Sequence, residues 1–428
     1  MNRERTFTYI GFAAIALLLF GLMGWYFFLR SQTSSVEDAA AGRGFSIGIP
    51  SFLGSRGSTA ANTEGSAVGA ESGEFGAGGS AFLQLLGIGR GTLNTPQQPT
   101  TQTGTTSSET KPQTPRFWRV SIAPIAGAAF TSASSSMLRY VERATGYVID
   151  VDPRTGEIKR LTNTLIPKVY DAHIGNGVFV LRTFDEAPST LRATIGSTTD
   201  GVSELITSNL GATIREVETD PSSRDILAIA GTPQAELLHF TSNTLSQRVL
   251  SIPGGEFMIA RTLNPILVEK AASGIMGSAF RTTPFTTLIQ DVAGLTILAH
   301  PTSDALVYGS DDGKRLRLFA RAAGGTAQEI SVATVADKCV WGKGSTAYCG
   351  VPQSDTGENF LNRWYRGETH ADDAWYTIDT AAATAEKLFT MDSGLGIDVE
   401  RPTIDSAGEY IAFINARDKS LWLLRITP

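Results

Sequence analysis

Residues 403–426 read TIDSAGEYIAFINARDKSLWLLRI, and this stretch decides the fold. Asp405 and Gly408 form a turn, Tyr410–Asn415 is a short apolar run, and a second turn leads to the apolar run that starts at Leu421. Short apolar runs bounded by Asp, Gly, Ser and Asn predict β-strands joined by tight turns. The same texture continues from Arg116 to the C-terminus without long helical periodicity. The sequence therefore predicts an all-β domain.

A strand of this kind recurs along the domain. Its copies are Met137-LRYVE, Val178-FVLRT, Ile226-LAIAG, Ile266-LVEKA, Ala305-LVYGS, Ala347-YCGVP and Tyr410-IAFIN. Their starts lie 41, 48, 40, 39, 42 and 63 residues apart. A period near 40 is typical of a four-stranded propeller blade. We therefore expect a seven-bladed β-propeller over residues 117–428, with six or eight blades as the alternatives because the unit from Glu256 to Gln290 is the least regular.

The two ends of the domain predict how the ring closes. The last unit ends in Leu421-WLLRIT and lacks a fourth strand, whereas Phe117-WRVSIAP is a surplus strand before the first unit. Pairing the surplus strand with the last unit would complete that blade and protect its edge.

At three places the repeat resembles the TolB-type, or WD40-like, propeller family. Residues 403–426 are similar to the turn "SPDGK" of that family and its following "IAF" and "LW" strands. Tyr147-VIDVDPRTGEIKRLT resembles the outer pair of strands, and His300-PTSDALVYGSDDGKRLRLFA resembles the whole unit. Other repeats, such as Asp337-KCVWGKGSTAY, depart from the pattern, so the resemblance concerns the architecture. It implies an interaction scaffold.

An apolar segment near the N-terminus predicts a membrane anchor. No charged residue occurs from Thr6 to Leu29, and the 21 residues from Tyr9 to Leu29 are long enough to cross a hydrocarbon core. Arg3 and Arg5 precede the segment, which favours a cytoplasmic N-terminus. We predict a cytoplasmic tail at 1–5 and a transmembrane helix at 6–30. A cleaved signal peptide is the alternative, although this apolar region is longer than usual for one.

Residues 31–116 have the composition of a flexible linker. This segment contains 15 Gly, 12 Ser and 12 Thr, and it ends in a stretch rich in Pro, Gln and Thr. Such a composition cannot bury enough apolar surface to offset chain entropy. We therefore expect a tether that displays the propeller outside the cytoplasm.

The net charge and the absence of catalytic motifs exclude several classes of function. The net charge is −6 and Lys and Arg form no cluster, which disfavours nucleic acid as a partner. The sequence has no G-x-S-x-G, H-E-x-x-H or P-loop motif. The four histidines lack metal-ligand spacing and are expected at turns or on the surface, and the aspartates at 311, 312, 372 and 373 are expected in solvated turns. We therefore assign no catalytic residue, metal or cofactor.

Cys339 and Cys349 flank a turn at Gly342–Ser345. If the turn is centred on Gly344, the two cysteines lie opposite each other on neighbouring antiparallel strands, close enough for a disulfide. An exported location would permit the bond. Two reduced, buried thiols are the alternative.

The longest interval inserts Pro352-QSDTGENFLNRWYRGETHADDAW before the strand Tyr376-TID. It supplies the candidate binding residues, of types enriched at interaction hot spots, which are Phe360, Trp364, Tyr365, Arg366 and Trp375. The alternative is that these aromatic residues fold the insertion back onto its own blade.

The expected function is a membrane-tethered extracytoplasmic propeller that binds an envelope protein or peptide. One alternative is a glycan- or peptide-processing enzyme with its site in the central channel, and another is an envelope sensor. Carboxylates or histidines converging at the channel mouth would favour the enzyme, whereas a dry or loop-capped channel would favour the scaffold.

Overall fold

In the computed structural model, the stretch that decides the fold forms the centre of a four-stranded antiparallel sheet. The strand β27 (Tyr410–Asn415) lies between β28 (Leu421–Arg425) and β26 (Val399–Ile404). Alternate residues of β27 point to opposite faces of the sheet. Tyr410, Ala412 and Ile414 pack against the first blade, whereas Ile411 and Phe413 pack against the sixth. Because neighbouring blades cover both faces, the strand is apolar at nearly every position instead of alternating.

The structure describes residues 114–131, 137–184, 191–197, 206–211, 214–221, 223–231, 234–241, 244–252, 256–260 and 265–427. The predicted tail at 1–5, the predicted transmembrane helix at 6–30 and nearly all of the predicted linker at 31–116 lie outside these ranges. Within the described ranges, no helix has the length and apolar character needed to cross a membrane.

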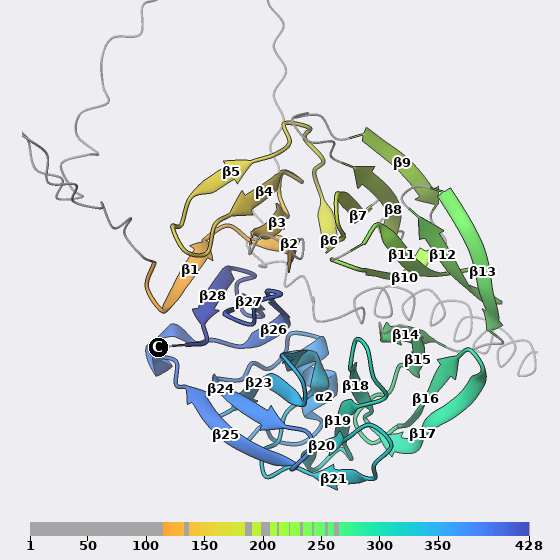
Figure 1. Cartoon of the computed structure of the whole chain (residues 1–428), viewed down its shortest axis with the longest axis vertical. Helices are drawn as coiled ribbons and strands as arrows, with labels where there is room; N and C mark the ends of the chain where they lie inside the picture. The colour runs from red at the N-terminus through yellow and green to blue at the C-terminus, as the bar shows by residue number, and fades with distance from the viewer. Residues whose placement is uncertain are drawn as a thin grey trace, which may run out of the picture. The chain divides into compact units, whose positions relative to one another are not determined.

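Seven four-stranded antiparallel sheets form the blades of a seven-bladed β-propeller (Figure 1). Blades 1 to 3 consist of β2 (Ile125–Phe130), β3 (Leu138–Glu142), β4 (Val148–Val151) and β5 (Ile158–Arg160); β6 (Val169–Ile174), β7 (Val178–Phe184), β8 (Leu191–Ser197) and β9 (Ile206–Gly211); and β10 (Ile214–Thr219), β11 (Asp225–Ala230), β12 (Ala235–Thr241) and β13 (Thr244–Ile252).

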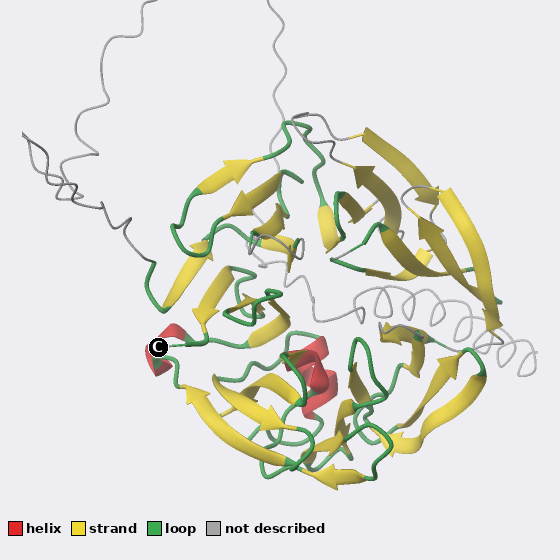
Figure 2. Cartoon of the chain, in the orientation of Figure 1, coloured by secondary structure: helices red, strands yellow, loops and turns green. Residues whose placement is uncertain are grey.

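Blades 4 to 6 consist of β14 (Phe257–Ala260), β15 (Ile266–Glu269), β16 (Met276–Thr282) and β17 (Phe285–Ala293); β18 (Thr296–Ala299), β19 (Leu306–Asp311), β20 (Leu316–Arg321) and β21 (Ala327–Glu329); and β22 (Cys339–Trp341), β23 (Thr346–Pro352), β24 (Asp373–Asp379) and β25 (Thr384–Phe389). Short helices occur at η2 (Ala336–Lys338), α2 (Phe360–Tyr365) and η3 (Ser393–Leu395), as Figure 2 shows in red for the last two.

The seventh blade joins both ends of the domain. Its outermost strand is β1 (Phe117–Ser121), which pairs antiparallel with β28 so that Phe117 faces Leu424 and Arg119 faces Trp422. The ring of Phe117 also stacks on the indole of Trp422, with 4.9 Å between their centroids. The surplus-strand prediction is therefore confirmed.

The seven recurring runs of the sequence are also confirmed. Each overlaps the second strand of one blade, namely β3, β7, β11, β15, β19, β23 and β27. These strands lie inside the blades, where β-branched and aromatic residues pack on both faces. The regular spacing of the runs therefore reflects the repeat of the blades. The last interval is longer because it contains the insertion between β23 and β24, which includes α2.

Candidate functional site

The insertion between β23 and β24 is anchored to blade 5 at the start of its helix. Asn359 has a left-handed backbone (φ 52°) just before α2, and its N–H donates to the carbonyl of Gly313 over 2.9 Å. The N–H of Leu361 donates to Oδ2 of Asp311 over 2.8 Å. Asp311 thus satisfies a donor of the first helical turn that would otherwise be buried without a partner.

A reciprocal amide contact ties the same helix to blade 4. The N–H of Ser273 donates to Oδ1 of Asn362 over 2.9 Å, and the N–H of Asn362 donates to Oγ of Ser273 over 3.2 Å. The hydroxyl of Ser273 in turn donates to Asp311 over 2.7 Å. Since α2 belongs to the sixth blade, it bridges three blades.

The apolar side of the insertion points into the protein. Phe360 is 1% exposed, Trp364 is 5% exposed and Trp375 is fully buried. Phe360 and Trp364 pack with Leu361 and Val335 in one cluster. These three of the five candidate binding residues are therefore out of reach of a partner, as expected if the insertion folds back onto the propeller. Only the half-buried Tyr365 and the exposed Arg366 remain accessible.

Beneath α2 lies a buried cluster of charges, formed by Lys338, Asp373 and Asp398, which we call the lysine cluster. The Nζ atom of Lys338 lies 2.7 Å from Oδ2 of Asp373 and 2.5 Å from Oδ1 of Asp398, and all three side chains have no exposed surface. The indole N–H of Trp364 donates to both oxygens of Asp398 at 3.1 Å, and Nδ1 of His370 lies 3.0 Å from Oδ2 of Asp398. The cluster joins the insertion to blades 6 and 7.

The two carboxylates of the lysine cluster differ in acidity. Burial raises the pKa of Asp373 to about 6, and its Oδ1 atom has no hydrogen-bond partner among the described residues. Burial also disfavours the charged form of Asp398, but Lys338, His370 and Trp364 together bring its pKa down to about 2. Although burial alone would lower the pKa of Lys338, the two carboxylates raise it. The lysine therefore stays charged.

A cleft of about 310 Å³ lies beside α2, and we call it the α2 cleft. Its lining includes Glu216, Glu256, Met258, Lys270, Tyr365 and Arg366. Arg182 also contributes, and its guanidinium forms a bidentate ion pair with the carboxylate of Asp171. Burial alone would raise the pKa of Asp171, but Arg182 holds it well below its usual range.

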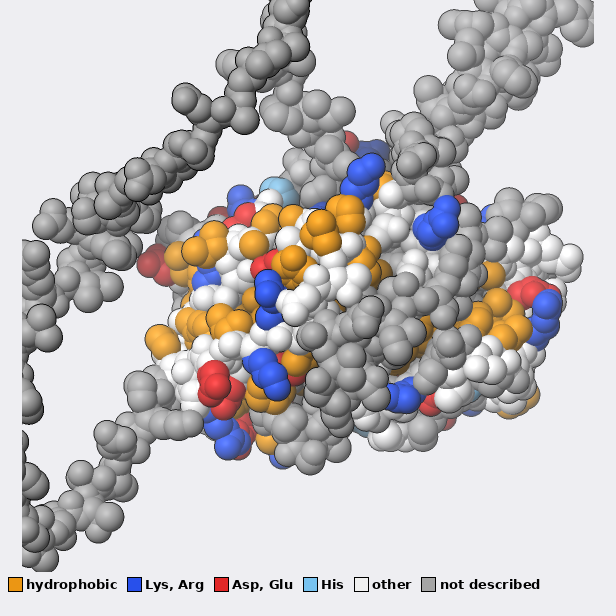
Figure 3. All heavy atoms as spheres, turned by 90° about the horizontal axis from the view of Figure 1, so that it is seen from above, with side chains coloured by type: hydrophobic (Ala, Val, Ile, Leu, Met, Phe, Trp, Pro, Cys, Tyr) orange, Lys and Arg blue, Asp and Glu red, His pale blue; other side chains and the backbone are white. Residues whose placement is uncertain are grey.

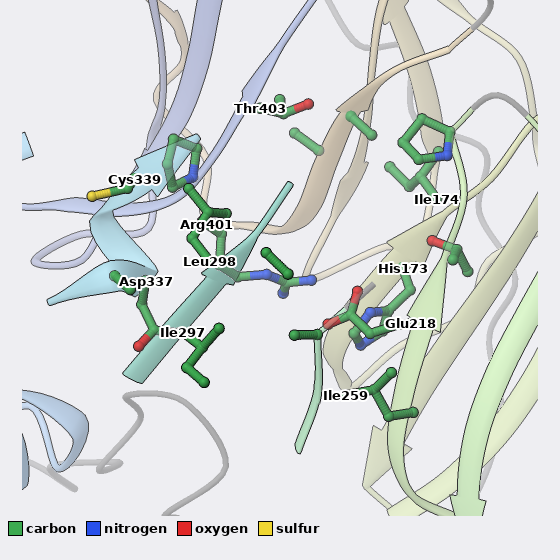
Figure 4. Close-up of a pocket in the computed structure, with 18 of the residues that line it drawn as sticks. His173, Ile174, Glu218, Ile259, Ile297, Leu298, Asp337, Cys339, Arg401 and Thr403 are labelled. Carbon is green, nitrogen blue, oxygen red and sulfur yellow. The ribbon is translucent and has the colours of Figure 1, made fainter. Parts of the chain in front are cut away.

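A second cavity, of about 290 Å³, is the central channel, which is lined by the inner strands of all seven blades. Its charged or titratable lining residues are His173, Glu218, Asp337 and Arg401. Figure 4 shows the guanidinium of Arg401 and the carboxylate of Glu218 pointing toward each other across this channel. The phenol of Tyr365 donates to Oδ2 of Asp337 over 2.7 Å, so α2 contacts the channel wall directly.

Sequence reasoning missed most of these polar groups. The prediction of a turn or surface position for His173 is wrong, because it lies in β6 and is 5% exposed. The prediction of solvated turns is also wrong for Asp311 and Asp373, which are buried, whereas Asp312 and Asp372 are exposed. The positions of Asp311 and Asp373 at the ends of strands could have indicated their burial, because a neighbouring loop can cover a strand end.

The two cysteines occupy the predicted positions. Cys339 of β22 is paired in register with Cys349 of β23, and their Cα atoms lie 4.1 Å apart. The structure joins their sulfur atoms in a disulfide. Formation of the bond in cells requires an oxidising compartment, so it stays a prediction linked to export.

Charge on the rim of the propeller is mixed. Figure 3 shows Lys and Arg side chains scattered among acidic, apolar and uncharged ones on the face seen there. In the described part of the chain, no group of three or more His, Cys, Asp or Glu side chains could hold a metal ion.

No protein-family model and no curated protein matches the sequence significantly. Solved structures match the fold. They include the β-propeller domain of the Trilobed protease from Pyrococcus furiosus (9% identity, TM-score 0.46, 72% of this chain and 96% of that chain). They also include U3-55K (9%, 0.44, 72% and 98%) and the computationally designed Ika8 protein (11%, 0.44, 72% and 97%). At such low identity these similarities concern the fold alone.

Proposed function

We propose that this protein is an interaction scaffold, a membrane-tethered extracytoplasmic β-propeller that binds an envelope protein or peptide at the α2 cleft. The observation that carries this proposal is that α2 is held by buried contacts with blades 4, 5 and 6 while Tyr365 and Arg366 border the cleft. A surface that is fixed before binding loses little conformational entropy when a partner docks.

The surroundings of the α2 cleft have the composition of an interface. Ile275 ends the loop between β15 and β16, Met276 begins β16, and the two are 59% and 61% exposed. They follow Ala271 and Ala272, which line the cleft. Apolar residues next to an aromatic residue and an arginine are typical of interaction hot spots. Glu256 and Lys270 add charges that can select the partner.

Two sequence features support the proposed location. The apolar segment from Tyr9 to Leu29 has the length of a membrane span. The disulfide between Cys339 and Cys349 is of a kind that persists in oxidising compartments outside the cytoplasm.

The enzyme alternative draws on the histidine and carboxylate of the central channel. A nucleophile or base needs a partner within hydrogen-bonding distance. In the part of the chain that the structure describes, Nε2 of His173 has no such partner. In addition, α2 contacts the channel wall through Tyr365 and Asp337.

In-cell photocrosslinking of the full chain tests the partner. A photoreactive residue at Met276 should yield a specific crosslinked envelope protein, and Arg366→Glu should reduce its yield at least about threefold because it reverses a charge beside the cleft. The matched control places the same probe at Ile158, an exposed residue on the outer strand of blade 1. Equal crosslinking patterns from both positions would exclude the α2 cleft.

Protease accessibility tests the topology separately. Protease added outside intact cells should cut within residues 31–116 and release the propeller, while the Cys339–Cys349 bond should block alkylation of both thiols before reduction. Protection of the linker would reverse the proposed orientation, and alkylation without reduction would exclude the disulfide.

A further inference from the structure

The lysine cluster beneath α2 holds an amine and two carboxyl groups in direct contact. The Nζ atom of Lys338 lies 2.7 Å from Oδ2 of Asp373 and 2.5 Å from Oδ1 of Asp398. Because a carbon–oxygen double bond is about 1.2 Å long, Nζ also lies within about 4 Å of the carboxyl carbon of Asp373. A small shift of the side chains therefore brings nitrogen and carbon to the separation of about 3 to 3.5 Å at which groups react.

Apolar rings enclose these groups. The three side chains of the lysine cluster have no exposed surface. The rings of Trp364 and Phe360 lie beside Nζ of Lys338, with their centroids 5.1 Å and 5.9 Å away. Both rings belong to α2 and are buried themselves. A closed site of this kind keeps bulk water away from the reacting groups and protects the product of a condensation from hydrolysis.

The two carboxyl groups are not equally supported. The indole N–H of Trp364 donates to both oxygens of Asp398, and Nδ1 of His370 lies 3.0 Å from one of them. Asp373 accepts the N–H of Val399 at Oδ2 over 2.7 Å, but its Oδ1 atom has no hydrogen-bond partner among the described residues. An ionised carboxylate is costly in such a position. Burial therefore raises the pKa of Asp373 to about 6, which makes Asp373 the more basic of the two.

From this geometry we infer that Lys338 and Asp373 join in an intramolecular isopeptide bond, with Asp398 as the group that transfers the proton. The bond is an amide between Nζ of Lys338 and Cγ of Asp373, and its formation consumes no other reactant. It encloses residues 338–373, which include β22, β23 and the insertion with α2. A covalent cross-link restricts the unfolded chain, so this bond stabilises blade 6. The inference concerns a modification of the fold and does not depend on the α2 cleft or its partner.

The reaction is a condensation in which no atom is oxidised or reduced. The ammonium group of Lys338 first passes a proton to Oδ2 of Asp373, which gives a neutral amine and a neutral carboxylic acid. The lone pair of Nζ then forms a bond with Cγ, and the carbonyl electrons move to Oδ1. Asp398 takes a proton from the nitrogen and passes it to Oδ2. The Cγ–Oδ2 bond breaks with its electron pair, Oδ2 leaves as water, and Oδ1 becomes the carbonyl oxygen of the amide.

Proximity and burial both favour the product. Groups held in a reactive geometry behave as if one were present at an effective concentration of about 10⁵ to 10⁸ M, which offsets the cost of making an amide in water. The bond also removes one positive and one negative charge from the protein interior, and Asp398 keeps its contacts with Trp364 and His370. A chain in which the bond has not formed retains all three ionisable side chains. The pH dependence of stability that arises from Asp373 therefore belongs to the unlinked chain.

Mass spectrometry of the purified full chain tests the inference without any variant. After denaturation and reduction of the disulfide, the linked chain should be lighter than the unlinked sequence by the mass of one water molecule. A tryptic digest should contain a branched peptide that joins Lys338 to the segment with Asp373. Because trypsin cuts after Lys387, the peptide with Asp373 is distinct from the peptide with Asp398. Unbranched Lys338 peptides throughout the population, or a branch to Asp398, would overturn the inference.

Variants assign the roles of the residues. Asp373→Ala should restore the full mass, and Asp398→Asn should slow bond formation at least about tenfold, measured as the linked fraction against time after cell-free synthesis. The matched control is Lys343→Met, which removes an exposed lysine from the turn between β22 and β23 and should leave the linked fraction unchanged. Loss of water in Asp373→Ala, or an unchanged rate in Asp398→Asn, would contradict the assignment. Should a variant fail to fold, the peptide map of the unmodified chain still decides the result.

Discussion

The lysine cluster and the central channel both hold charged groups inside the propeller, but they resolve those charges differently. In the lysine cluster, Lys338 contacts the carboxylates of Asp373 and Asp398. The indole N–H of Trp364 also donates a hydrogen bond to Asp398. In the channel, among the residues that the structure describes, Arg401 donates to two backbone carbonyls, and Nε2 of His173 lies 3.6 Å from Oδ2 of Asp171 without a hydrogen-bond partner. Paired buried charges hold a structure together, whereas unpaired ones are more typical of a site.

The largest effect is expected from breaking the lysine cluster. Lys338→Met leaves Asp373 and Asp398 buried without their cation, so the free energy of unfolding should fall by about 3 to 5 kcal/mol. Urea unfolding followed by tryptophan fluorescence measures this loss. The control is Arg248→Met, which removes an exposed ion pair with Glu236 and should cost less than about 1 kcal/mol. Equal losses for both variants would contradict the assigned role.

A smaller effect concerns the pH dependence of stability. The pKa of Asp373 is about 6 in the folded protein and near 3.8 when unfolded, so the folded state retains a proton that the unfolded state loses between these values. This contribution is fully present below about pH 4 and is lost as the pH rises through about 6. Relative to Asp373→Asn, the unmodified protein should therefore lose about 1 to 3 kcal/mol of stability between pH 4.5 and pH 7.

The depressed pKa of Asp398 acts in the opposite direction and at lower pH. Its contribution is present above about pH 4 and is lost as the pH falls toward about 2. Measurements above pH 4.5 therefore isolate Asp373. Parallel stability curves for the unmodified protein and Asp373→Asn over that range would show that Asp373 is charged throughout.

The smallest effect is expected where the two regions meet. Tyr365→Phe removes the hydrogen bond to Asp337 on the channel wall, so thermal unfolding should show a loss of about 1 kcal/mol. The matched control is Tyr376→Phe, whose hydroxyl has no such bond among the described residues and whose ring faces Lys387. A loss no larger than in this control would mean that α2 does not depend on the channel wall.

The sequence predicted the blades because the second strand of each blade has the same apolar pattern. Tyr410–Asn415 and its six counterparts are apolar on both faces, and turn residues separate them at regular spacing. The pairing of β1 with β28 was also predictable, because the last unit lacked one strand and the first had one too many.

The sites were not predictable in the same way. Asp373 and Asp398 lie 35 and 60 residues after Lys338 in the sequence. The three side chains meet only after the blades have assembled. Arg401 lies in β26 between a charged residue and a proline, and nothing in the local sequence reveals the bulge in this strand or the direction of the side chain. Residue type alone also selected Phe360, Trp364 and Trp375 as contact residues, although the same apolar character drives them into the core.

The pairing of β1 with β28 also sets the order in which the domain can be completed during synthesis. Phe117–Ser121 is synthesised early, but its partner strand Leu421–Arg425 follows about 300 residues later. Until β28 has been synthesised, the edge of β1 has no partner strand, and unpaired strand edges make β-sheet proteins prone to misassembly. Any cellular factor that binds Phe117–Ser121 during this interval would delay ring closure without touching the finished protein.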